Sequence, residues 1–107
     1  MNILFVHASA EWSTYDTAMG YRNALVALGH DVRDFTFYNR LKYHAKALGA
    51  PLNQDMSLVS RLASESVLPE ALLHGADLVV IACAMAFHPN ALWLLRRASL
   101  PVALILT

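Results

Sequence analysis

The sequence predicts an α/β fold: a doubly wound, Rossmann-like parallel sheet of about four strands in the order 2-1-3-4, with helices on both faces. Residues 2–7 and 77–83 are short, nearly continuous apolar runs, which are typical of strands buried on both faces. Helical patterns separate the predicted strands, and parallel neighbours need such crossovers. A length of 107 residues fits a single domain.

The first strand, Asn2–His7, leads into a short polar segment and then a helix from about Thr14 to Leu28, which Gly29 closes. Residues 30–37 follow, in which apolar and charged side chains alternate. That alternation indicates a second strand near the edge of the sheet, where one face is partly solvated.

The link to the third strand is long but filled with helical patterns, and a fifth helix follows that strand. Pro89 belongs in the first turn of this last helix, and Arg96 and Arg97 suit its C-terminal end. The remaining predicted elements are helices over 38–48, from 55 or 57 to 67, over 69–74 and over 89–97, with strands over 77–83 and 102–106.

The composition is 57% hydrophobic and 15% charged, with equal numbers of basic and acidic residues. A neutral chain lacks the broad basic face of a nucleic-acid-binding domain, so we expect no nucleic-acid partner. The single cysteine, Cys83, excludes an internal disulfide, and no secretory signal is visible. These features favour the cytoplasm.

The sequence stops on an apolar run, at Leu106 and Thr107, without a polar tail. Core strands seldom form the very end of a domain. We therefore expect the chain to be a fragment of a longer protein.

Two predicted loops meet at the carboxyl ends of the first and third strands, where open parallel sheets bind their ligands. One runs from His7 to Thr14 and the other from Ala84 to Asn90. The candidate substrate-binding side chains at this edge are His7, Ser9, Trp12, Ser13, Thr14 and Asn90.

His88 and Glu11 are the candidate catalytic residues. Histidine is the side chain that suits general base chemistry near neutral pH, so His88 suits a general base, although it equally suits the N-cap of the helix at Pro89. Glu11 suits an acid–base role or stabilisation of a helix start. No glycine lies between His7 and Thr14, so no dinucleotide or Walker A loop is present, and the histidine spacing indicates no metal site.

The predicted helix over 38–48 carries Arg40, Lys42 and Lys46. These cations are consistent with an ordinary solvated helix face. They are also consistent with weak peripheral contact with an anionic membrane, an attraction that moderate salt would screen.

Several motifs resemble the N-terminal lobe of GT-B glycosyltransferases, most closely the CgeB-like group. The strand Ile3-Leu4-Phe5-Val6 resembles the "ILFV" first strand of that family, and the stretch from Ala24 to Val32 resembles its "aLxxxGHeV" entry to the second strand. Residues 75–81 resemble its "kaDvVhv" strand, and residues 100–107 its "xPvvlxxT" strand.

The resemblance implies an acceptor-side lobe that binds a sugar or glycan acceptor. In such enzymes a C-terminal lobe, absent from this chain, holds the nucleotide-sugar donor, so we expect no tightly bound cofactor and no turnover here. Trp12 then either stacks on a sugar or anchors its loop. The alternative is a non-catalytic, flavodoxin-like ligand-binding or regulatory module.

Overall fold

The computed structural model describes residues 1–8, 15–49, 57–82 and 87–105. Its four strands form one parallel sheet in the order β2-β1-β3-β4, which confirms the predicted fold class and strand order. The strands are β1 (Asn2–His7), β2 (Asp31–Thr36), β3 (Leu78–Ile81) and β4 (Val102–Leu104). The helices are α1 (Tyr15–Ala27), α2 (Phe37–Ala47), α3 (Ser57–Glu65), α4 (Val67–His74) and α5 (Pro89–Arg97).

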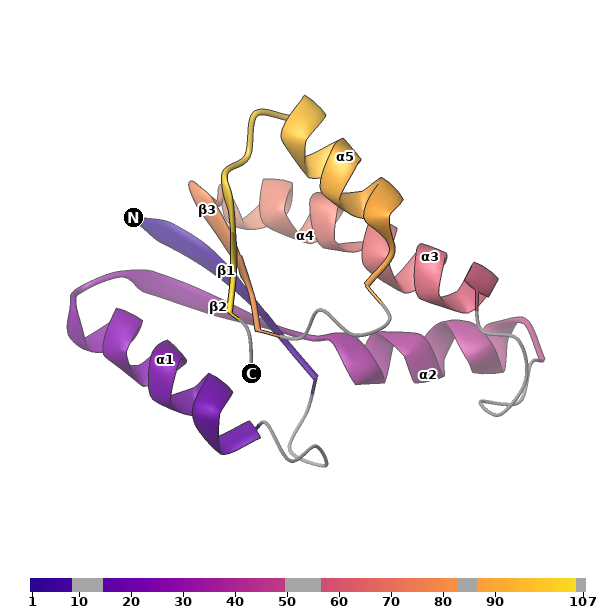
Figure 1. Cartoon of the computed structure of the whole chain (residues 1–107), viewed down its shortest axis with the longest axis horizontal. Helices are drawn as coiled ribbons and strands as arrows, with labels where there is room; N and C mark the ends of the chain where they lie inside the picture. The colour runs from indigo at the N-terminus through magenta and orange to yellow at the C-terminus, as the bar shows by residue number, and fades with distance from the viewer. Residues whose placement is uncertain (9–14, 50–56, 83–86, 106–107) are drawn as a thin grey trace.

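Helices cover both faces of the sheet (Figure 1). The connection from β1 to β2 runs through α1 on one face. The connections from β2 to β3 and from β3 to β4 run in the opposite direction across the sheet, and their helices α2 to α5 pack on the other face. A right-handed crossover places helices on opposite faces when the direction of travel reverses.

Two apolar clusters fill the space between the layers, and β1 contributes to both. Leu4 and Val6 point into the larger cluster under α2 to α5, whereas Ile3 and Phe5 point into the smaller one under α1. Side chains alternate across a strand, so a strand with helices on both sides must be apolar at every position. This explains the uninterrupted apolar run near the start of the sequence.

Two hydrogen bonds between Asn2 and Asp77 fix how β1 lies against β3. The Asn2 backbone N–H donates to the Asp77 carboxylate at 2.9 Å, and the Asp77 backbone N–H donates to the Asn2 carbonyl at 2.7 Å. Just before Asp77, α4 ends at Gly75, whose φ of 66° is the left-handed conformation that favours glycine. The chain thus reverses sharply from α4 into β3.

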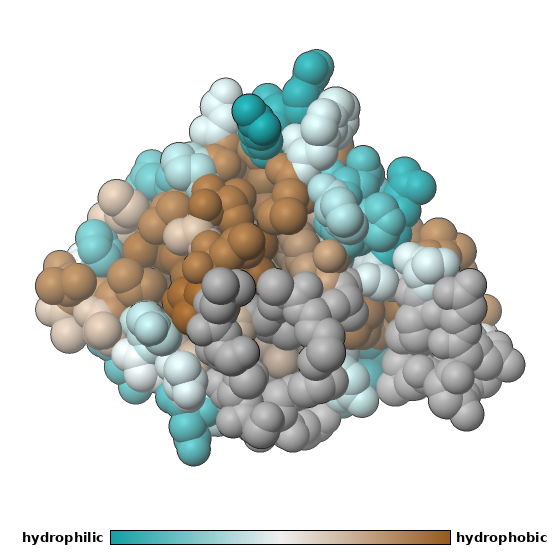
Figure 2. Space-filling view, viewed as in Figure 1, coloured by the Kyte–Doolittle hydropathy of each residue, from teal (hydrophilic) through white to brown (hydrophobic). Residues whose placement is uncertain are grey.

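The edges of the sheet differ in character. β2 carries charged residues, and Arg22 of α1 donates a 2.7 Å hydrogen bond to Asp34 of β2. β4 is entirely apolar, and Leu104 is 51% exposed. Figure 2 shows apolar side chains gathered on the face between α1 and α5, where the edge strand β4 lies toward the viewer.

None of the described helices combines the length and apolarity needed to cross a membrane.

The smaller cluster makes β1 sensitive to truncation on its α1 side. Phe5 is fully buried there, so Phe5→Ala should lower the free energy of unfolding by about 3–5 kcal/mol, through lost burial and the cavity left behind. Tyr21→Ala on the exposed surface of α1 should change it by less than about 0.5 kcal/mol. Urea denaturation followed by circular dichroism measures both values, and equal losses would contradict the two-sided burial of β1.

Candidate functional site

The carboxyl edge of the sheet brings the ends of β1 and β3 together, as the sequence predicts. Val6 pairs with Ile81, and the Ala82 backbone N–H donates to the Val6 carbonyl at 2.8 Å. His7 lies at the end of β1, and the segment that follows β3 leads to His88 at the start of α5. The candidate residues Ser9, Glu11, Trp12, Ser13 and Thr14 lie outside the described residues, as does Cys83.

His7 is almost completely buried, with 7% of its surface exposed. The centroid of its ring lies 6.2 Å from the centroid of the Phe5 ring and 6.2 Å from that of the Tyr15 ring, between the strand and the start of α1. Its Nδ1 atom has no hydrogen-bond partner among the described residues. A buried nitrogen without a hydrogen-bond partner costs free energy, so a hydrogen bond between Nδ1 and a ligand group would be favourable.

Burial lowers the pKa of His7, and the charge of Arg22 lowers it further, while Asp34 opposes both effects. His7 is therefore a neutral imidazole at pH 7. A neutral imidazole has one nitrogen that donates and one that accepts a hydrogen bond, which suits it to orient a hydroxyl group.

His88 is the N-cap of α5. Its Nδ1 accepts a 3.1 Å hydrogen bond from the backbone N–H of Asn90, and Pro89 occupies the first turn. This arrangement gives one of the free N–H groups of the helix a partner. Because Nδ1 acts as the acceptor, the proton of the neutral ring lies on Nε2.

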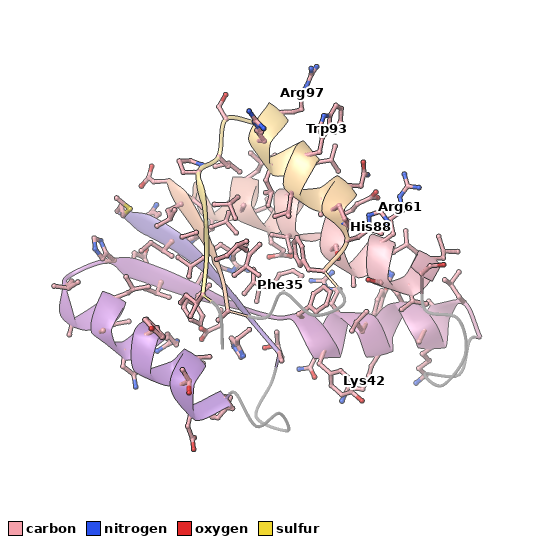
Figure 3. The ribbon with its side chains drawn as sticks, in the orientation of Figure 1. Phe35, Lys42, Arg61, His88, Trp93 and Arg97 are labelled. Carbon is pink, nitrogen blue, oxygen red and sulfur yellow. The ribbon has the colours of Figure 1, made fainter. Side chains whose placement is uncertain are left out.

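Helix α3 supplies the groups that hold this turn in place. The fully buried Ser64 hydroxyl accepts a 2.8 Å hydrogen bond from the His88 backbone N–H. The Glu65 carboxylate accepts hydrogen bonds from the Asn90 side-chain amide at 2.7 Å and from Arg61 Nε at 2.8 Å. Figure 3 shows Arg61 and His88 close together where α3 meets the start of α5.

Sequence reasoning missed the contributions of Ser64 and Glu65. They lie 24 and 25 residues before their partners, and only the packing of α3 against α5 joins them. The one local signal is the i, i+4 spacing of Arg61 and Glu65, which is typical of a helical ion pair. These two partners, Arg61 and Asn90, lower the pKa of the Glu65 carboxyl.

The structure does not join the two histidines directly. No hydrogen bond or ring contact among the described residues links His7 to His88, and His88 instead lines a shallow hollow with Ser57, Leu58 and Arg61. Among the described residues, no three His, Asp or Glu side chains are grouped so that they could hold a metal ion.

The basic residues of α2 lie on two faces of the helix: Lys42 and Lys46 are four positions apart and share one face, whereas Arg40 lies on another. Arg40 and Lys42 are two positions apart, which rotates them by about 200°. Arg40 Cζ lies 5.3 Å above the Phe35 ring, whereas Lys42 Nζ lies 4.9 Å above the Tyr38 ring. Lys42 points away from the sheet (Figure 3), and Lys46 is exposed in the last turn. Membrane contact through these residues stays a prediction.

A scan against protein-family models and searches of curated proteins and of solved structures find no match to this chain.

The capping role of His88 can be separated from any role in proton transfer. His88→Ala should lower the free energy of unfolding by about 1 kcal/mol, because the Asn90 N–H loses its partner. His88→Asn should leave it nearly unchanged, because asparagine is among the best N-cap residues. Urea denaturation of both variants measures the difference, and equal stability of the Ala variant and the native protein would contradict the cap.

The burial of His7 predicts a pH dependence of stability. Because its pKa in the folded protein is below the ordinary value of 6.5, the unfolded chain binds the proton more readily. Stability should therefore be complete above pH 6.5 and fall as the pH drops below it. Burial, together with Arg40, also lowers the pKa of His44, which adds to the same slope.

Urea midpoints measured from pH 7.5 to 5.5 test this dependence. His7→Phe should show a smaller decline than the native protein, and His44→Gln should remove a separate part of it. A native-like slope in the His7→Phe variant would contradict the burial of a neutral imidazole.

Proposed function

We propose that the chain is the N-terminal, acceptor-side lobe of a GT-B glycosyltransferase, which binds a sugar or glycan acceptor at the carboxyl ends of β1 and β3. The observation that carries the proposal is the juxtaposition of these two strand ends, with His7 at one and the turn to His88 at the other. In an open parallel sheet, the reversal of strand order opens a crevice at such a point.

The chemistry of the two histidines supports a hydroxyl-bearing ligand. His7 is held neutral beside two aromatic rings, and its Nδ1 has no hydrogen-bond partner among the described residues, which suits a hydrogen bond to a sugar hydroxyl. His88 uses Nδ1 for the helix cap, so Nε2 is the nitrogen that would meet an acceptor hydroxyl. With its proton on Nε2, the capped tautomer donates a hydrogen bond there and acts as a base only after tautomer exchange. Glu11 is then the more direct base.

Under this proposal the nucleotide-sugar donor binds mainly to a second lobe. The residues 1–107 alone should bind acceptor without transferring sugar, and the full enzyme would work in the cytoplasm. The side-chain N–H of Asn90 already donates to Glu65. The side-chain oxygen of Asn90 has no hydrogen bond among the described residues, so it is the atom that would accept a hydrogen bond from the ligand.

The strand order favours one alternative function. The order β2-β1-β3-β4 is also that of the first four strands of flavodoxin-like folds, which bind flavin mononucleotide at the same edge. A non-catalytic ligand-binding module of that kind would purify yellow, or acquire flavin absorbance when mixed with flavin mononucleotide. The absence of glycine between His7 and Thr14 argues against the glycine-rich phosphate loop that the flavodoxin-like alternative needs.

The two tryptophans, Trp12 and Trp93, provide the test. Titration with common hexoses and hexosamines should change the tryptophan fluorescence, because Trp12 stacks on the bound sugar. Trp12→Phe should abolish the change. Trp93→Phe should keep it, because Trp93 lies on the outer surface of α5 beside Arg97, with 55% of its surface exposed. No change with any of these sugars, or a change that depends on Trp93, would contradict the proposal.

A further inference from the structure

A hollow lined by described residues lies along the outer edge of β2. It has a volume of about 620 Å³, within the range of small-molecule sites. Four consecutive residues of β2 line it, together with residues of α2 and Glu70 of α4. We call it the β2 groove; its lining residues are Arg33, Asp34, Phe35, Thr36, Asn39, Arg40, Tyr43 and Glu70.

Two arginines share one carboxylate in the β2 groove. Arg33 Nη2 lies 3.5 Å from one Glu70 oxygen, and Arg40 Nη2 lies 3.6 Å from the other. Neither pair is among the hydrogen bonds of the described residues, so the guanidinium donors are attracted to Glu70 without being saturated by it. Each guanidinium carries five N–H donors in a planar fork, which matches the oxygens of a phosphate or carboxylate group.

The lining of the β2 groove carries two arginines and two acids, which balance in formal charge, but one of the acids is paired with an arginine outside the lining. This acid is Asp34, which receives a 2.7 Å hydrogen bond from Arg22 of α1, outside the groove. Two arginines against Glu70 leave one positive charge in excess. Arg40 is also held in place, because its guanidinium lies over the Phe35 ring and its side chain is only 35% exposed.

The open edge of the sheet adds backbone donors. The Asp31 N–H donates to the carbonyl of Met1, which directly precedes β1, so in this parallel pair residues 31, 33 and 35 direct their backbone groups to β1. The N–H groups of Asp34 and Thr36 therefore face the open edge, in the lining of the groove. The Thr36 side chain makes no cap hydrogen bond to α2, which leaves its hydroxyl available.

From this arrangement we propose that the β2 groove binds the phosphate or carboxylate group of a small molecule between Arg33 and Arg40, with Glu70 as a built-in competitor for the same donors. The bound oxyanion takes hydrogen bonds from the two guanidinium groups and from the open edge of β2. Glu70 gives up its two long contacts as the ligand enters. This site is separate from the proposed acceptor site, because none of its lining residues belongs to the β1 and β3 ends.

Because Glu70 competes with the ligand, substitutions of Glu70 and of the two arginines should change the ligand affinity in opposite directions. ¹⁵N-labelled protein is titrated with sodium phosphate and, separately, with sodium acetate at a constant ionic strength of about 0.15 M, at which long-range attraction is screened. Saturable shifts should appear at the amides of the β2 groove. Arg40→Ala and Arg33→Ala should each weaken binding about tenfold, as expected for loss of a charge-assisted hydrogen bond.

Glu70→Gln should tighten binding several-fold, since it removes the competing charge and keeps the shape of the side chain. Arg96→Ala, at an exposed arginine in the last turn of α5, is the matched control and should leave the affinity unchanged. A higher affinity for phosphate or for acetate identifies which oxyanion the groove prefers.

Two results would overturn the proposal. One is the absence of saturable shifts with both anions in the native protein and in Glu70→Gln. The other is an equal loss of affinity in Arg96→Ala and Arg40→Ala, which would show that only the overall charge matters. Because Glu70→Gln retains both arginines, its expected gain in ligand affinity tests the proposal even if an arginine variant fails to fold.

Discussion

The burial of β1 between two strands and two helical layers is the constraint on which the rest of this structure depends. β1 pairs with β2 on one side and β3 on the other, and its side chains from Ile3 to Val6 are at most 1% exposed. A strand in this position cannot carry a charged side chain without burying it, and an isolated buried charge is very costly. Among the described strands, polar side chains are therefore confined to the two ends of β1 and to the edge strand β2.

This constraint also explains how far the sequence predicts the fold. The apolar run of β1 matches its predicted bounds, because double burial leaves no mixed pattern to misinterpret. α4 instead begins at Val67, two residues before the predicted start at Pro69. Proline tolerates any position in the first turn, where the N–H groups have no partner within the helix. Pro69 therefore fixes the first turn of α4 without fixing its first residue.

The candidate site is less predictable because its contacts are not local. The position of His88 before Pro89 indicates an N-cap, and the structure contains that contact. His88 has a second partner, Ser64, which the sequence shows only as a polar residue within a predicted helix. The burial of Ser64 depends on the packing of α3 against α5. Glu65 likewise meets Asn90 through that packing. The sequence marks the turn at α5, but only the assembled layers show which groups hold it.

The hydrogen bonds distinguish the two polar regions of the molecule. Around His88, the helix cap, the Ser64 hydroxyl and the Glu65 carboxylate already have partners, so much of the hydrogen-bonding capacity there stabilises the turn. In the β2 groove, two arginines face a single carboxylate at distances beyond a good hydrogen bond, beside an open strand edge. Guanidinium donors that the folded chain leaves unsaturated can still form favourable hydrogen bonds with an acceptor group of a ligand. That physical difference is the basis for proposing the edge of β2, as well as the carboxyl ends of β1 and β3, as a ligand site.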